Sequence, residues 1–567
     1  MKTWSKFSKK FVSQNLGRWA RSVEDVNLLN VLKARSLVVG LCFCFIFVLI
    51  SLRLLDVMLL RTMPVSSLGK AEEGIAGLFL KRSDILDRNG EVLATQLITA
   101  SVFANPKMII DPKEAAQKLA ALLPDQSYET LYKKLSSGKG FVWIARHIPP
   151  KLQYEINYQG IPGIFLQKDS KRVYPYGDLV SHVLGNCDID NKGLAGIEKY
   201  FDSKLEGSPE PLRLSIDVRL HYAITQEILA AMERYNADGG NAMVMDIQTG
   251  ELLAMVSVPT YDPNNLGKVK IEHTFNRNTL GVYEPGSTFK IVTTAIALNE
   301  KIATIASVFD ATNPIKIGRF TVKDFKGKQR PLTVSEIFVY SSNIGAAKMA
   351  LTFGSKVQQM YLKLLGFFDT PKLEIPELGS PLYPKTWSEA TTITAAYGYG
   401  VAVTPLQSLI GISTIVNDGI KPDATLLKRE GFYKNNNESI IDPKVSKHIR
   451  DLMRLLVTKT IVKGVNAPGL EIFGKTGTAH KNNRKFYSDT DRFTFFIGGF
   501  PHSSPRYMVY VMLDDPKPIK ETHGYATAGW NAAPTASSII SRIAPILGVV
   551  AKEDIDPSTL TPAVYIR

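Results

Sequence analysis

Residues 291–298, apolar except for Thr293 and Thr294, constrain the fold more than any other stretch of this chain. Pro285 and Gly286, shortly before it, favour a turn that leads into a helix. A helix that is apolar around most of its circumference must be enclosed by other elements, so this pattern predicts a central buried helix. Ser287 and Lys290 lie one turn apart at its start, which places the Lys290 amine near the Ser287 hydroxyl.

Serine and lysine at this spacing suit nucleophilic catalysis, because an amine can take the proton of a hydroxyl that attacks a carbonyl carbon. An ordinary lysine, with a pKa of about 10.4, is protonated at neutral pH. Burial, and the positive charge of Lys475, would disfavour the ammonium form of Lys290. We therefore predict that Lys290 is the base for Ser287. The alternative is a Lys290 stem that covers apolar surface with its ammonium group in water.

The Ser-x-x-Lys pattern is weak on its own, since residues 67–70 and 136–139 also match it. The copy at residues 287–290 differs because two further elements follow it in order. These are Ser-Ser-Asn at residues 341–343 and Lys-Thr-Gly-Thr at residues 475–478. The ordered set is typical of penicillin-binding proteins and serine β-lactamases.

Ser341 and Asn343 stand between two apolar stretches, at a predicted turn into a helix. Most Ser-x-Asn sequences at such places only cap the helix. We predict instead that Ser341 relays a proton toward the leaving amine. Asn343 is predicted to hydrogen-bond Lys290 and the substrate backbone.

Glycines bracket Lys475 and Thr476 on a predicted strand, where they would let another backbone approach closely. We predict an edge strand that pairs with a peptide substrate, while Lys475 attracts the terminal carboxylate of that peptide. Thr476, Gly477 and Thr478 are the predicted substrate-binding residues. The backbone N–H groups of Ser287 and Thr478 would form an oxyanion hole.

The N-terminal region has the pattern of a membrane anchor. Residues 1–35 contain eight Lys or Arg against two acidic residues, and residues 36–52 carry no charge. A 17-residue helix spans about 26 Å, and the apolar residues up to position 60 would complete a span of about 30 Å. We predict an uncleaved single-pass helix at residues 36–60 with the basic tail in the cytoplasm. A processed signal peptide is the alternative.

Composition narrows the other possibilities. A chain of 567 residues with 45% hydrophobic content can form two or three folded domains. The formal net charge of +15 would permit nucleic-acid binding, but the basic residues are not gathered into one long tract, so we expect no nucleic-acid partner. Cys187 is the single cysteine outside the apolar run, so we expect no disulfide and no cysteine-based metal site on the exported side. No metal and no cofactor are predicted.

The remaining pattern predicts an α+β fold. Short strands, turns and surface helices alternate up to about residue 214. The first is a predicted strand over residues 82–90 that ends in a glycine turn and continues over residues 91–94 as a hairpin. Beyond residue 215, strands at both ends enclose a region in which helices dominate, residues 287–419. The predicted strands cover residues 241–246, 248–256, 470–478, 492–500 and 507–513, and predicted helices at the two ends cover residues 218–232 and 533–547.

With these motifs the chain resembles class B penicillin-binding proteins over most of its exported region. Further similarity lies in Asp-Arg-Asn-Gly at 87–90, in Arg-x-Tyr-Pro at 172–175, in Gly-x-x-Gly-x-Glu at 193–198 and in Tyr-Gly-Tyr-Gly at 397–400. The sequence pattern and the resemblance together predict five parts. They are a cytoplasmic basic tail (1–35), a transmembrane anchor (36–60), an elongated non-catalytic pedestal (61–214), a transpeptidase domain (215–550) and a C-terminal tail (551–567). The transpeptidase domain is expected to have an antiparallel sheet, flanking helices and a helical subdomain.

The resemblance also implies an activity and a place in the cell. Members of the family transfer peptidoglycan stem peptides from a D-Ala-D-Ala donor to an amine through a serine acyl-enzyme, and β-lactams inhibit them. Ser-x-Asn with Lys-Thr-Gly-Thr resembles the division-specific, FtsI-like branch. This implies a bacterial inner-membrane protein with a periplasmic catalytic domain, partnered by an FtsW-like glycosyltransferase and other divisome proteins.

Several functional alternatives use the same residues. A D,D-carboxypeptidase or β-lactamase would pass the acyl group to water instead of an amine. An elongation-type transpeptidase or a non-catalytic penicillin sensor or scaffold are further alternatives. The anchor and the pedestal favour the transpeptidase, because a free β-lactamase needs neither.

Overall fold

The computed structural model describes residues 28–55, 82–318, 320–431, 433, 435–459, 465, 467–482 and 487–552. The chain divides into two compact units, Met1–Leu80 and Lys81–Arg567. In the first unit the structure describes one helix, α2 (Leu28–Leu55), which overlaps the predicted anchor; residues 56–60 of that prediction lie outside the described residues. No helix within the described residues is long and apolar enough to cross a membrane, so the structure does not confirm the predicted span.

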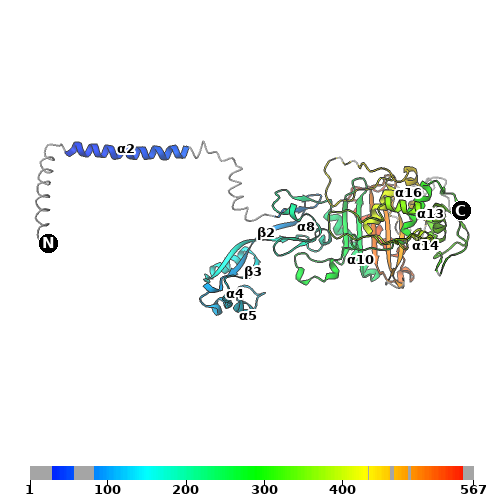
Figure 1. The fold of residues 1–567 in the computed structure, drawn as a ribbon, viewed down its shortest axis with the longest axis horizontal. Helices are drawn as coiled ribbons and strands as arrows, with labels where there is room; N and C mark the ends of the chain where they lie inside the picture. Colours follow the sequence, from blue (N-terminus) through cyan, green and yellow to red (C-terminus); the bar gives the residue numbers. More distant parts are fainter. Residues whose placement is uncertain are drawn as a thin grey trace. The chain divides into compact units, whose positions relative to one another are not determined.

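A five-stranded antiparallel sheet organises the C-terminal part of the second unit. Its order is β14-β15-β16-β8-β9, so strands from both ends of the domain, green and orange in Figure 1, lie side by side. Helices α10 and α17 pack against this sheet and against each other. The predicted sheet and its terminal helices are therefore confirmed. The bounds are β8 (Gly239–Asp246), β9 (Leu252–Val258), β14 (Phe473–Asn482), β15 (Tyr487–Phe500), β16 (Tyr507–Asp514), α10 (Val218–Tyr235) and α17 (Ala532–Ile543).

Helix α11 (Lys290–Asn299) is the predicted central helix. Every residue from Lys290 to Leu298 is buried, and the helix is enclosed by α12, α13, α15 and α16. Two small two-stranded sheets interrupt the region that was predicted to be mainly helical, β10 with β13 and β11 with β12. The other bounds are α12 (Val334–Tyr340), α13 (Asn343–Leu364), α14 (Glu389–Ala395), α15 (Pro405–Val416), α16 (Pro443–Lys459), β10 (Val308–Asp310), β11 (Ile315–Ile317), β12 (Phe320–Val322) and β13 (Pro331–Thr333).

The pedestal is built on a second sheet with the order β3-β2-β1-β7, in which β4 also pairs with β2. The predicted hairpin is confirmed, since β1 pairs antiparallel with β2. Strand β1 is shorter than predicted because the buried Asp87 carboxylate accepts hydrogen bonds from the N–H groups of Asn89 and Glu91, which starts the turn before residue 90. Helices α4, α5 and α6 cover the outer core. The bounds are β1 (Ile85–Leu86), β2 (Val92–Ala104), β3 (Val142–Ile148), β4 (Ile164–Val173), β7 (Leu212–Arg213), α4 (Pro112–Leu122), α5 (Tyr128–Leu135) and α6 (Pro150–Tyr158).

The inner part of the pedestal shares its hydrophobic core with the region of the five-stranded sheet, since Ile85, Leu184 and Met243 belong to one buried cluster. A buried ionic cluster also stabilises the inner part of the pedestal. The Glu198 carboxylate accepts hydrogen bonds from Arg82 Nε and Arg172 Nε, each at 2.6 Å. Both guanidinium groups and the carboxylate are almost fully buried, so removal of one partner would leave a buried charge uncompensated. The outer part has a core of its own around α4 and α5.

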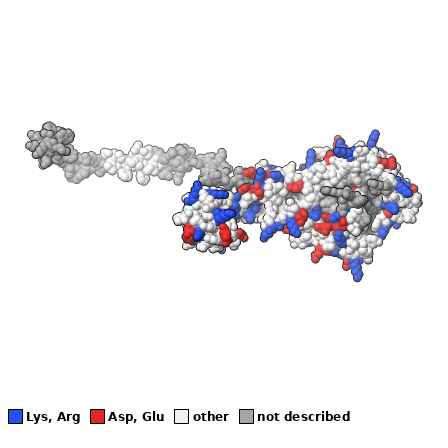
Figure 2. Space-filling view, turned by 60° about the horizontal axis from the view of Figure 1, so that its bottom comes forward, with Lys and Arg blue, Asp and Glu red and all other residues white. Residues whose placement is uncertain are grey.

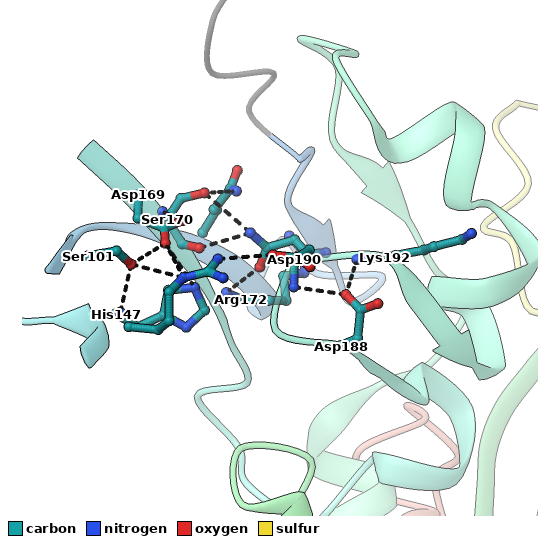
Figure 3. A network of polar contacts seen from close by, with 11 residues as sticks. Ser101, His147, Asp169, Ser170, Arg172, Asp188, Asp190 and Lys192 are labelled. Carbon is teal, nitrogen blue, oxygen red and sulfur yellow. Dashed lines mark hydrogen bonds and ion pairs between the residues drawn. The ribbon is translucent and has the colours of Figure 1, made fainter. Parts of the chain in front are cut away.

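A polar network joins three strands of the pedestal sheet and contains Ser101, His147 and Asp169 (Figure 3). Ser101 Oγ donates to Asp169 Oδ2 and accepts from Arg146 Nε at 3.0 Å and from the His147 backbone N–H at 3.3 Å. The His147 ring lies 3.6 Å from Asp169 and, among the described residues, makes no hydrogen bond with Ser101. The arrangement is therefore an interstrand link and not a serine activated by histidine. On the face drawn in Figure 2, basic and acidic side chains are interspersed.

Candidate active site

Ser287 lies in a 3-10 turn, η5 (Gly286–Phe289), that leads directly into α11. Gly286 has a φ of +53°, and a Cβ on it would stand 2.8 Å from the backbone oxygen of Thr478. Only glycine allows both the left-handed backbone and this close approach. The Pro285-Gly286 turn was predicted, whereas the 3-10 geometry of the first turn was not. The turn brings Ser287 to strand β14.

The Lys290 amine is the centre of the candidate site. Its Nζ lies 2.9 Å from Ser287 Oγ, 2.7 Å from Asn343 Oδ1, 2.8 Å from the Ser341 carbonyl oxygen and 3.0 Å from Ser341 Oγ. The side chain is 1% exposed, so the alternative of an ammonium group in water is wrong. An ammonium group has three N–H donors, fewer than the four oxygens around it. The neutral amine has two N–H donors and one lone pair, so in that form it can accept a hydrogen bond from the Ser287 hydroxyl.

Ser341 and Asn343 lie at the junction of α12 and α13, as predicted. Ser341 ends α12 with a left-handed backbone, φ +57°, which turns its carbonyl and its hydroxyl toward Lys290. The helix cap is made by Ser342, whose Oγ accepts the Gly345 N–H at 3.0 Å. Because Ser342 supplies the cap, the side chains of Ser341 and Asn343 remain available to the lysines.

Lys475 enters the same cluster from β14. Its Nζ lies 3.2 Å from Ser341 Oγ and 6.0 Å from the centre of the Phe338 ring, and its side chain is buried. Burial lowers the pKa of Lys475 to about 7. Burial and then the Lys475 charge lower the pKa of Lys290 well below its ordinary value, while Asp324 acts in the opposite direction. The two causes that lower the pKa of Lys290, burial and the Lys475 charge, are the two that the sequence predicts.

Strand β14 is the edge of its sheet, which confirms the predicted edge strand. Lys475 and Gly477 are buried, whereas Thr476 and Thr478 are half-buried. A Cβ on Gly477 would lie 2.9 Å from the Pro285 carbonyl oxygen, so this glycine is needed for the strand to approach the Ser287 turn. The structure thus brings all eight predicted site residues onto two adjoining surfaces. One is formed by the start of α11 and the α12–α13 junction, and the other is β14.

Asp324 is a site-supporting residue that the sequence did not reveal. Its Oδ1 accepts hydrogen bonds from the N–H groups of Asn343 and Ile344 at 2.6 and 3.0 Å. Its Oδ2 accepts a hydrogen bond from the Ser342 hydroxyl at 2.7 Å. A carboxylate at a helix N-terminus satisfies free N–H groups and fixes the direction in which α13 begins. Asp324 follows β12 in a loop without periodicity, so no sequence signal linked it to Ser341.

The comparisons with known proteins agree with this geometry. The model of the penicillin binding protein transpeptidase domain matches residues 240–541, and that of the penicillin-binding protein dimerisation domain matches residues 80–219. The probable peptidoglycan D,D-transpeptidase FtsI of Caulobacter vibrioides is 33% identical over 504 residues, covering 86% of this chain and 84% of that one. The peptidoglycan D,D-transpeptidase FtsI of Escherichia coli K12 is 29% identical over 517 residues, covering 85% of each chain.

A solved structure shows the same fold. The peptidoglycan synthetase from Bifidobacterium adolescentis matches with a TM-score of 0.66 at 21% identity, covering 84% of this chain and 97% of that one. The serine and two buried lysines beside an edge strand, together with these family matches, place the chain in the class of penicillin-binding proteins. The chain belongs to their class B, the FtsI-like family with a pedestal before the transpeptidase domain.

Proposed function

We propose that this protein is a serine D,D-transpeptidase that cross-links peptidoglycan stem peptides through an acyl-enzyme on Ser287. The observation that carries the proposal is the position of the Lys290 amine, 2.9 Å from Ser287 Oγ and fully buried. A neutral amine can donate its two hydrogens to the Ser341 carbonyl and Asn343 Oδ1, the two nearest oxygens. Its lone pair then accepts the Ser287 proton while Oγ attacks the carbonyl of the penultimate D-Ala.

In this mechanism Ser341 returns the proton. Its Oγ lies within 3.2 Å of the amines of both Lys290 and Lys475, so a proton can pass through it to the departing D-Ala nitrogen. The released D-Ala leaves, and an amine of a neighbouring strand attacks the acyl-enzyme. That amine loses its proton along the same path in reverse, and Ser287 regains its hydroxyl.

Strand β14 would hold the donor peptide as an added strand. Its free edge offers backbone groups to an extended peptide, with Thr476, Gly477 and Thr478 alongside the scissile bond. Protonated Lys475 attracts the terminal carboxylate. The N–H groups of Ser287 and Thr478 are the proposed oxyanion donors, because the two segments meet at Gly286.

A fluorescent penicillin should acylate Ser287 of the full-length protein. The modified peptide, mapped by mass spectrometry, should contain this serine, and Ser287→Ala should remove the label. Among the described residues no carboxylate is hydrogen-bonded to Ser287 or Lys290, so the label should persist for many minutes. Rapid release of the drug would favour a hydrolase instead, and a label on another serine would contradict the mechanism.

The second-order rate constant of acylation by benzylpenicillin should fall as the pH rises above about 7, because Lys475, with a pKa of about 7, then loses the charge that attracts the drug carboxylate. From pH 7 to pH 8.5 we expect a decrease of about tenfold. In Lys475→Arg the guanidinium stays charged, so the decrease should disappear. An unchanged decrease in Lys475→Arg would assign it to another group. Stopped-flow measurement of acylation from pH 7 to pH 8.5 gives the rate constants of the wild type and of Lys475→Arg.

We further propose that residues 36–60 anchor the protein in the bacterial inner membrane, with the catalytic domain in the periplasm, and that it works in septal synthesis beside an FtsW-like glycosyltransferase. The uncharged run, its basic flank and the two relatives named FtsI support this. A fluorescent fusion should collect at division sites in growing cells. Uniform signal along the side wall would contradict septal work and favour elongation.

A further inference from the structure

A carboxylate that the mechanism does not use lies three residues before the nucleophile. Glu284 is half-buried, and its Oε1 accepts the Gly400 N–H at 2.7 Å and the Tyr487 hydroxyl at 3.0 Å. Its other oxygen, Oε2, accepts no hydrogen bond from a residue that the structure describes. Within the part of the chain that the structure describes, one oxygen of Glu284 is therefore occupied and the other receives no donor.

Three tyrosines stand around this carboxylate. The rings of Tyr397 and Tyr399 lie 5.7 Å apart, and those of Tyr399 and Tyr487 lie 5.8 Å apart and meet edge to face. Burial and then the Glu284 charge raise the pKa of Tyr399, while a hydrogen bond with the backbone of His480 opposes this. Tyr399 thus connects the carboxylate to strand β14. We name Glu284, Tyr397, Tyr399 and Tyr487 the Glu284–tyrosine cluster.

Glu284 gives the cluster its negative charge. In the described parts of the chain no Lys or Arg forms an ion pair with Glu284, and burial raises the pKa of its carboxyl group. A carboxylate lined by phenol rings attracts cations, because the ring faces add to the attraction of the negative charge. A primary ammonium fits especially well, since it can donate to Oε2 and lie against a ring.

The cluster lies at one end of the proposed substrate strand. Along β14 the order is Lys475, then Thr478 beside Gly286, then Asn482, which pairs with Tyr487. A donor peptide whose carboxylate is held by Lys475, and whose scissile bond faces Ser287, continues its upstream residues toward Tyr487. The side chain just upstream of the D-Ala-D-Ala pair is therefore the part of the donor closest to Glu284.

We propose that the Glu284–tyrosine cluster binds the side-chain ammonium group of the donor residue that precedes D-Ala-D-Ala, and so selects stem peptides with a free side-chain amine. This rests on the proposed transpeptidase function. The cluster acts on recognition of the acyl donor and leaves the proton transfers to Lys290 and Ser341. Glu284 would be a specificity-determining residue.

Two thioester donors that differ by one charge test the proposal. One is Nα-acetyl-L-Lys-D-Ala-thioglycolate, with a free ε-ammonium, and the other is its Nε-acetylated analogue. Thiol release by the full-length protein gives kcat/KM for each. The wild type should prefer the charged donor by about tenfold or more, whereas Glu284→Gln should show almost no preference. Glutamine keeps the oxygen that accepts the Gly400 N–H, so the local fold is retained.

Two more variants sharpen the result. Tyr487→Phe keeps the ring and removes the hydroxyl, so the preference should fall only about threefold. Glu300→Gln is the matched control, because Tyr361 donates to Glu300 Oε1 at 2.6 Å in the same kind of pair elsewhere in the domain. It should keep the full wild-type preference.

The outcomes separate this proposal from the proposed function. Equal preference in the wild type and in Glu284→Gln, with Ser287 still labelled by a fluorescent penicillin that carries no ammonium group, would overturn the role of the cluster alone. Absence of preference in the wild type would do the same. Failure of penicillin to label wild-type Ser287 would overturn the transpeptidase proposal itself. Near-complete loss of preference in Glu284→Gln, a smaller decrease in Tyr487→Phe and full preference in Glu300→Gln would support the cluster.

Discussion

Lys290→Arg should lose acylation of Ser287, with the second-order rate constant for benzylpenicillin falling by about 10³-fold or more. A guanidinium remains protonated at any pH at which the protein is folded, so it cannot take the Ser287 proton. The wild-type amine can do so because burial and the neighbouring Lys475 charge lower its pKa. Stopped-flow labelling with a fluorescent penicillin measures the loss.

A guanidinium buried beside Lys475 can also disturb the fold, so a second variant separates the two effects. Lys290→Met has a similar length, needs no charge to be buried and cannot act as a base, and it should show the same kinetic loss while keeping a wild-type Tm. Lys348→Arg is the control, because Lys348 pairs with Asp310 at the surface at 3.0 Å. Its labelling rate should stay within about twofold of the wild type. Wild-type labelling of Lys290→Met would remove Lys290 from the role of base.

The contacts of the site that could be predicted from the sequence are mainly those between residues close together in the chain. Ser287 and Lys290 are one turn apart, so their contact follows from helix geometry alone and is observed at 2.9 Å. The placement of Lys475 could be predicted because the ordered motifs belong to a known family. Burial of Lys290 could be predicted from the apolar residues that follow it.

The parts that could not be predicted depend on contacts between distant segments. Asp324 fixes the start of α13 through three hydrogen bonds, but it stands in a loop that shares no pattern with residues 341–343. Tyr487 reaches Glu284 over 203 positions in the sequence. In the pedestal, Asp87 shortens β1 by accepting backbone N–H groups, a competition that strand propensity does not include.

Gly398→Ala is the second substitution with a large expected effect. Gly398 has a φ of +89°, and a Cβ on it would lie 2.0 Å from the carbonyl oxygen and 2.5 Å from the nitrogen of Gly286. The Gly286 N–H donates to the Gly398 carbonyl oxygen at 3.1 Å, so the two backbones cannot separate without losing this bond. The clash therefore acts on the turn that positions Ser287. We expect destabilisation by about 3 kcal/mol and acylation slower by about 10²-fold.

Gly90→Ala distinguishes the clash from backbone strain, because Gly90 has a similar φ of +98° but no atom within 4 Å of an added Cβ. The Gly90→Ala substitution should lower the free energy of unfolding by about 1 kcal/mol, because of the left-handed backbone alone. This variant should be acylated at the wild-type rate. Thermal unfolding and penicillin labelling of both variants, compared with the wild type, measure the two effects. If Gly398→Ala acylates as fast as Gly90→Ala, the Gly286–Gly398 contact does not position the nucleophile. The reactivity of Ser287 would then depend on α11 and β14 without this loop.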